Sequence, residues 1–149
     1  MLEAQPAKLD ADEVAPGLWV GRTPPNGVKL PGIDVVVLAA VEKQTRYFPG
    51  SKIIQCPLDD AVPSTADVER AIRCAEAVSR HRARGKTVLV ACDMGINRSA
   101  WIAAMSLVLD GMDAEEAIAQ VRRRRRLVVG HALSNQDFVR VVRMLGATS

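Results

Sequence analysis

The residues of this chain best suited to chemistry on a phosphate are a cysteine and an arginine with five residues between them. Cys92 ends a short apolar run, residues 88–91, and Arg98 with Ser99 begins another apolar segment. If the first run is a strand, it brings the thiol to the carboxyl edge of a sheet, where open α/β proteins bind their ligands. The N–H groups of the connecting loop and the positive end of the following helix can then surround an anion.

Arg98 adds a planar, permanently charged group that can bind two phosphate oxygens. The same positive groups favour the thiolate of Cys92, which is the nucleophilic form. Its attack on phosphorus would give a phosphocysteine and split one difficult displacement into two easier ones. We expect the phosphoryl group to be bound by Arg98 and by the loop residues Asp93, Met94, Gly95, Ile96 and Asn97.

This pattern resembles the signature loop of cysteine-dependent protein phosphatases, and it is closer to their dual-specificity branch than to the large tyrosine-specific one. Four further segments resemble that branch in order: residues 14–21, 32–38, 56–60 and 121–138. The first two resemble strands of the family, the third its general-acid segment and the last its final two helices. The resemblance covers roughly residues 14–145, and it implies a hydrolase of phosphate monoesters with no metal or organic cofactor.

A general acid is needed to protonate the leaving oxygen, and a carboxylic acid on a facing loop can serve. Asp59 and Asp60 both follow Pro57. The family places its acid three residues after the position matched by Pro57, so the resemblance selects Asp60, with Asp59 as the alternative. It also implies that the Ser99 hydroxyl helps the thiolate to leave when the intermediate is hydrolysed.

The chain departs from the family at Ala91, where a histidine usually helps to orient the loop and to keep the thiolate ionised. A methyl group cannot do this, so we expect a less stabilised thiolate than is usual in the family. A pseudophosphatase, which binds phosphate without turnover, is therefore one alternative. A rhodanese-like sulfurtransferase, which also carries a cysteine loop at a sheet edge but needs no acid such as Asp60, is another.

The loop residues also bear on the substrate. The acidic Asp93 and its neutral neighbours disfavour a highly anionic ligand. We expect a phosphorylated protein side chain: phosphotyrosine first, with phosphoserine and phosphothreonine as further candidates. A small metabolite or a nucleic-acid 5′ phosphate is the alternative within the enzyme class.

Five consecutive arginines, Arg122 to Arg126, fall near the expected end of a helix. Cations suit that end of a helix, so a solvated terminus is one interpretation. A basic patch for an acidic peptide flank or a second phosphate is the other. The chain has few aromatic residues to stack bases, so we predict no nucleic-acid partner.

The three cysteines show no paired spacing, which argues against a disulfide framework and suits a reducing cytoplasm. Cys56 is interpreted either as a buried structural residue or as a partner for Cys92 in a protective disulfide. Cys74 falls on an expected helix and should pack. His81 and His131 lack the spacing of metal ligands, so we predict no metal site.

Length and composition indicate one globular domain, since 149 residues can enclose a core and 48% of them are apolar. No apolar run approaches the ~20 residues of a membrane span, so neither a membrane partner nor a signal peptide is expected. We divide the chain into a lead-in, residues 1–13, and a dual-specificity phosphatase-like domain, residues 14–149. Nothing in the sequence predicts the oligomeric state.

Apolar patterns predict strands over residues 18–21, 34–40, 52–56 and 87–91. Helices are expected over residues 64–84, over residues 99–110, from Asp113 into the arginines, and from Ser134 onward. Residues 21–32 hold three glycines and three prolines and should form an irregular loop, where the family often has a helix. The fold class is therefore α/β: a mostly parallel sheet of about four to five strands with helices on both faces.

Overall fold

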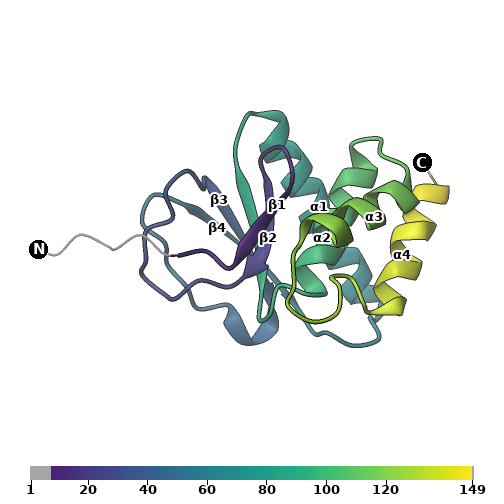
Figure 1. Cartoon of the computed structure of the whole chain (residues 1–149), viewed down its shortest axis with the longest axis horizontal. Helices are drawn as coiled ribbons and strands as arrows, with labels where there is room; N and C mark the ends of the chain where they lie inside the picture. Colours follow the sequence, from purple (N-terminus) through teal and green to yellow (C-terminus); the bar gives the residue numbers. More distant parts are fainter. Residues whose placement is uncertain (1–7, 149) are drawn as a thin grey trace, which may run out of the picture.

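A mixed sheet lies at the centre of the structure, a computed structural model in which residues 8–148 are described (Figure 1). Its five strands are β1 (Ala11–Ala15), β2 (Leu18–Arg22), β3 (Val35–Ala40), β4 (Lys52–Leu58) and β5 (Val88–Cys92). Their order is β1-β2-β5-β3-β4, and all neighbours are parallel except β1 and β2. The expected α/β fold with a mostly parallel sheet is confirmed.

Strand β1 begins inside the segment that we expected to be a lead-in. It pairs antiparallel with β2 through a tight turn in which Gly17 has a φ of +73°. Glycine adopts this left-handed conformation without strain, which explains its place in the turn. Residues 1–7 of the expected lead-in lie outside the described residues, as does residue 149.

Strands β3 and β5 are buried along their whole length, as continuous apolar runs predict for strands covered on both faces. Side chains alternate between the two faces. Val88, Val90 and Cys92 contribute to one hydrophobic cluster, whereas Leu89 and Ala91 contribute to the other. The thiol of Cys92 and the methyl group of Ala91 therefore belong to opposite sides of the sheet.

The α-helices are α1 (Thr65–Ala83), α2 (Arg98–Leu109), α3 (Ala114–Arg124) and α4 (Gln136–Ala147). In the described part of the chain, all four pack on the Cys92 side of the sheet, with α2 at their centre (Figure 1). Our expectation of helices on both faces is wrong. Within residues 8–148, only the β4–β5 crossover is α-helical, because α2, α3 and α4 all follow the last strand.

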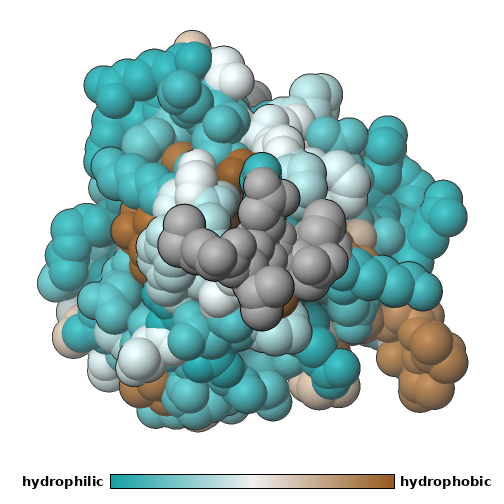
Figure 2. Space-filling model, turned by 90° about the vertical axis from the view of Figure 1, so that its left-hand side faces the viewer, coloured by the Kyte–Doolittle hydropathy of each residue, from teal (hydrophilic) through white to brown (hydrophobic). Residues whose placement is uncertain are grey.

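Loops cover the other face of the sheet instead. Leu30, Ile33 and Phe48 pack there against β3 and β5, and a short 3₁₀ helix, η1 (Val41–Lys43), follows β3. Residues 23–34 contain no α-helix, as their glycines and prolines predict. The surface on this side is mostly hydrophilic, with small hydrophobic patches (Figure 2). No helix among the described residues is long and apolar enough to cross a membrane.

Side-chain caps fix where α1, α3 and α4 begin. Ser64 and Asp67 form the expected capping box of α1, and Asp113 caps α3 by accepting from the N–H of Glu116. The last helix differs from our prediction, which placed its start at Ser134. Asn135 is the cap instead, because its Oδ1 accepts from the N–H groups of residues 137 and 138.

Candidate active site

Cys92 ends the central strand β5 at the carboxyl edge of the sheet, as the sequence predicts. Its side chain is buried, and its Sγ lies 3.1 Å from the Oγ of Ser99 on the first turn of α2. A cavity of about 270 Å³ opens beside it. The cavity is lined by Asp60, Cys92, Asp93, Met94, Ile96, Asn97, Arg98 and Ser134.

The carbonyl groups of the loop between β5 and α2 all have donors outside the loop. The Cys92 oxygen accepts from both the N–H and the hydroxyl of Thr23, and the Asp93 oxygen accepts from Nε of Arg22. The next two oxygens, of residues 94 and 95, accept from Arg125. The last two, of residues 96 and 97, accept from the N–H groups of residues 133 and 101.

The N–H groups of residues 93–97 have no acceptor among the described residues. In a trans peptide the C=O and N–H point in opposite directions, so carbonyls held from outside aim the N–H groups the other way. Polar backbone groups without partners are rare in buried sites and need an explanation. A bound anion that accepts from these donors at the start of α2 is the simplest one.

Gly95 is required by this loop for two reasons. Its φ is +66°, and a Cβ at this position would lie 2.5 Å from the carbonyl carbon of Gly21 and 2.7 Å from Nη2 of Arg125. A side chain therefore fits neither the backbone conformation nor the space.

Arg98 is held by an acidic partner that sequence reasoning missed. Its Nη1 and Nη2 donate to the two carboxylate oxygens of Glu42 at 2.7 and 2.8 Å, and Nη1 also donates to the Leu58 oxygen at 2.9 Å. Nε–H and the second Nη2–H, along one edge of the guanidinium, have no acceptor among the described residues. That edge can bind two phosphate oxygens.

The pair is electrostatically strong. The hydrogen bond from Arg98 lowers the pKa of Glu42 from 4.5 to about 2, and the same bond raises the pKa of Arg98 above its ordinary value. Both groups are therefore charged throughout the neutral range. A signal for Glu42 exists in the sequence, because an acid just after a buried strand must lie at the same sheet edge as Cys92.

Asp60 lines the same cavity from a different part of the chain, the segment that follows β4. Its carboxylate accepts from Nδ2 of Asn97 at 2.9 Å and from Nδ2 of Asn135 at 3.0 Å. Asp59 is exposed and does not line the cavity. The geometry thus favours Asp60 over its alternative, and it adds Asn135 as a residue that the sequence had assigned only to a helix motif.

Two charged side chains offset Asp93, the acidic loop residue on which our substrate argument depends. Lys43 lies 3.9 Å from its carboxylate, and Arg22 donates to its backbone oxygen and to the sulfur of Met94. The negative charge of Asp93 at the rim of the cavity is therefore partly balanced. This weakens the expectation, based on Asp93, that highly anionic substrates are disfavoured.

Cys56 is buried on β4 and has Cys74 of α1 as its neighbour. The hydrogen bond from Cys74, followed by burial, raises the pKa of the Cys56 thiol. Strand β3 lies between Cys56 and Cys92, and two strand spacings amount to about 9–10 Å. A disulfide needs Cα atoms within about 7 Å, so the geometry favours the structural interpretation of Cys56.

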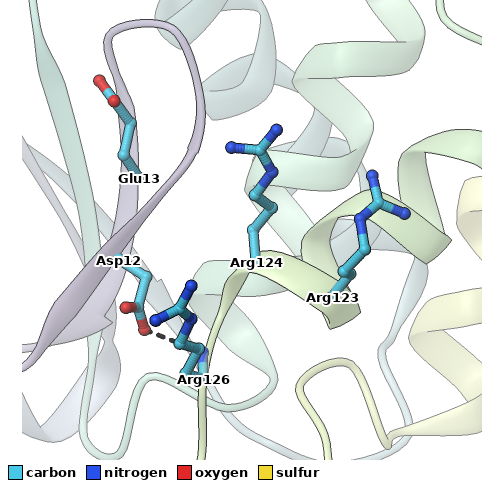
Figure 3. A pocket seen from close by; sticks show the side chains of 5 residues that line it. All are labelled: Asp12, Glu13, Arg123, Arg124 and Arg126. Carbon is cyan, nitrogen blue, oxygen red and sulfur yellow. Dashed lines mark hydrogen bonds between the residues drawn. The ribbon is translucent and has the colours of Figure 1, made fainter.

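The arginine run at the end of α3 divides into two kinds. Arg123, Arg124 and Arg126 line an open cavity of about 350 Å³ with Asp12 and Glu13, and their side chains extend from the ribbon as Figure 3 shows. The remaining members point inward: Arg122 donates to the Leu133 oxygen, and Arg125 is buried against the loop. Helical spacing gave a signal here, because Arg125 follows the buried Val121 by four residues.

No group of three or more histidine, cysteine or acidic side chains in the described residues could hold a metal ion. The arrangement that the structure does build is a buried thiol, a guanidinium with one free edge, a row of N–H donors and a carboxyl group that lines the same cavity. It suits binding of a tetrahedral oxyanion with a nucleophile on one side and a proton donor on the other.

Comparison with known proteins agrees with a site that binds an oxyanion next to a cysteine nucleophile. Residues 22–144 match the family described as dual specificity phosphatase, catalytic domain. The chain belongs to this family, which decides against the rhodanese-like alternative. No curated protein sequence matches the chain.

Solved structures show the same fold at low identity. Human DUSP28 is 18% identical with a TM-score of 0.77, over 97% of this chain and 98% of that one. Human tyrosine phosphatase-like serine/threonine/tyrosine-interacting protein is 23% identical with a TM-score of 0.74, over 93% and 96%. OH1 from the Orf virus, a tyrosine phosphatase, is 17% identical with a TM-score of 0.70, over 97% and 90%.

Proposed function

We propose that this chain hydrolyses phosphate monoesters on proteins, phosphotyrosine first, through a phosphocysteine on Cys92. The observation that carries the proposal is the buried thiol beside N–H groups without acceptors and the free edge of Arg98. Family membership supports it. Met94 and Ile96 add apolar surface to the cavity, which suits an aromatic ring next to the phosphate.

In the first step, the Cys92 thiolate attacks phosphorus and the bond to the ester oxygen breaks. Arg98 and the loop N–H groups bind the phosphoryl oxygens, where charge must be stabilised. Asp60, as the carboxylic acid, transfers its proton to the departing oxygen, so that an alcohol or phenol leaves.

In the second step, water attacks the phosphocysteine and the sulfur–phosphorus bond breaks. The Asp60 carboxylate takes a proton from this water, and phosphate is released. The Ser99 hydroxyl, 3.1 Å from the sulfur, stabilises the thiolate as it leaves by donating a hydrogen bond.

Hydrolysis of para-nitrophenyl phosphate across pH 5–8, with EDTA present, tests this proposal. We expect turnover by the wild type and a loss of about 10⁴-fold or more with Cys92→Ser, because a serine hydroxyl is a poor nucleophile without a base. Turnover that needs a metal, or that survives Cys92→Ser, would contradict the mechanism.

A folded wild type that binds phosphate without turning over would instead favour the pseudophosphatase alternative. Ala91 would then be the suspected cause. Its methyl group packs in the loop-covered cluster, on the side of the sheet away from the sulfur.

A further inference from the structure

Arg125 is the most completely engaged side chain near the loop, and the mechanism above gives it no role. Its side chain is 1% exposed. Its Nε donates to the Gly95 oxygen at 3.0 Å and its Nη2 to the Met94 oxygen at 3.1 Å. Burial of a charge this deep is unfavourable unless it is paired and hydrogen-bonded.

Two carboxylates of the N-terminal part of the domain balance this charge. Nη1 of Arg125 donates to Asp10 at 3.0 Å and to Asp12 at 3.1 Å. Asp12 also accepts from the backbone N–H of Arg126, which is the dashed bond in Figure 3. The guanidinium is thus fixed from both sides. The carboxylates of Asp12 in β1 and of Asp10 just before β1 hold one side, and the loop carbonyls hold the other.

The two carbonyls that Arg125 holds belong to the middle of the loop. The Met94 oxygen shares its peptide plane with the N–H of Gly95, and the Gly95 oxygen shares its plane with the N–H of Ile96. Because each plane is rigid, a donor on the carbonyl side turns the N–H group to the opposite side. Gly95 needs this support most, since glycine has the greatest backbone freedom.

We propose that Arg125 is a positioning residue that aims the N–H groups of Gly95 and Ile96 at the phosphoryl oxygens. It acts through the backbone and does not itself touch the ligand. The proposal rests on the phosphate-binding site described above, and it explains why one arginine of the run is buried while its neighbours are exposed.

The exposed neighbours supply a matched control. Arg125→Lys keeps the positive charge beside Asp10 and Asp12, but one ammonium cannot replace Nε and Nη2 at both carbonyls. Arg124→Lys is the same change one residue earlier, at a side chain with no hydrogen-bond partner among the described residues.

Binding of inorganic phosphate, measured by calorimetry and by protection of Cys92 from iodoacetamide, is the test. We expect Arg125→Lys to weaken phosphate binding about tenfold, as loss of well-oriented donors predicts. At one fixed pH and without phosphate, alkylation of Cys92 should also be slower than in the wild type, because fewer N–H groups stabilise the thiolate. Arg124→Lys should change neither quantity.

A folded Arg125→Lys protein that matches Arg124→Lys in both quantities would overturn the proposal, because a purely structural role lowers only the melting temperature. If Arg125→Lys does not fold, Asp12→Asn against Glu13→Gln provides the test. Only the first removes a carboxylate from Arg125, and we expect it to weaken phosphate binding about twofold to threefold. Equal phosphate affinities of these two variants would again overturn the proposal.

These measurements need no turnover. A wild type that binds phosphate but hydrolyses nothing would contradict the proposed function. The role of Arg125 would still be decided by the phosphate affinities of the same variants. A wild type that does not bind phosphate would contradict both.

Discussion

The two walls of the cavity are held in different ways. On one wall, every carbonyl from Cys92 to Asn97 has a donor, and Arg98 is fixed by a carboxylate and a backbone oxygen. On the other wall, Asp60 lies in the exposed segment 59–62 and is held by two amide side chains. The binding wall is therefore organised before a ligand arrives, whereas the position of the acid depends on a few solvent-exposed bonds that are individually weak.

The largest effect should come from the preorganised wall. Arg98→Lys keeps the charge but loses the planar pair of donors, and we expect kcat/KM to fall about thousandfold. Steady-state kinetics with a phosphotyrosine peptide measure it. Arg124→Lys, which donates to no residue of the loop, is the control and should change kcat/KM less than threefold or so. Similar losses in both variants would mean that the two arginines are equivalent.

The acid wall should give the next effect. Asp60→Asn removes the proton donor, so kcat for a phosphotyrosine peptide should fall about hundredfold. The loss should be smaller with para-nitrophenyl phosphate, because its leaving group needs less protonation. Asp59→Asn is the matched control. A larger loss with Asp59→Asn than with Asp60→Asn would reverse the assignment.

Substitution of Glu42 tests whether its hydrogen bonds to Arg98 are needed for the chemical step or only for phosphate binding. Glu42→Gln keeps the shape of the side chain but breaks the two-point contact, so we expect kcat to fall about tenfold. Affinity for phosphate should change less, because a negative charge near the ligand is also removed. An unchanged kcat would show that the Leu58 oxygen alone orients Arg98.

The pH dependence of the Glu42 contribution follows from its pKa of about 2, below the ordinary 4.5. A depressed carboxyl pKa stabilises the folded state fully above the unfolded value and loses that contribution as pH falls through the folded one. The difference in free energy of unfolding between wild type and Glu42→Gln should thus be constant above pH 4.5 and shrink towards pH 2. Urea unfolding at several pH values measures it, and a difference that shrinks between pH 8 and 6 would contradict it.

The smallest effect should come from Asn135, which both caps α4 and binds Asp60. Asn135→Ser keeps a capping oxygen but cannot reach Asp60, so kcat should fall a few-fold with little change in melting temperature. Asn135→Ala should show the same kinetic loss together with about 1 kcal/mol of destabilisation. Equal kcat in wild type and Asn135→Ser would mean that Asn97 holds the acid alone.

The sequence alone was sufficient to predict the site residues that lie close together in the chain. Cys92, Arg98 and Ser99 are joined by one loop, so their spacing determined that they meet. Asp60 came from a resemblance, because nothing local distinguishes it from Asp59.

The partners missed by sequence reasoning come from other parts of the fold. Glu42 follows β3 and Arg125 follows α3. Their local patterns indicate a sheet edge and an inward-facing side chain, but the strand order and the packing of α3 decide that both meet the loop. The face that the helices cover was likewise decided by tertiary packing, since alternating strands and helices are compatible with either side.

The pairing of Arg98 with Glu42 has a consequence for the response to dissolved salt. If phosphate binds as proposed, the cation nearest to it is already paired with Glu42, so much of the attraction should come from the N–H dipoles of the loop. Mobile ions screen fields that extend over the Debye length, about 10 Å at 0.1 M, and they act weakly on contacts from which they are excluded. Ionic strength should therefore control how quickly a charged protein substrate approaches, and change far less how firmly its phosphate is bound.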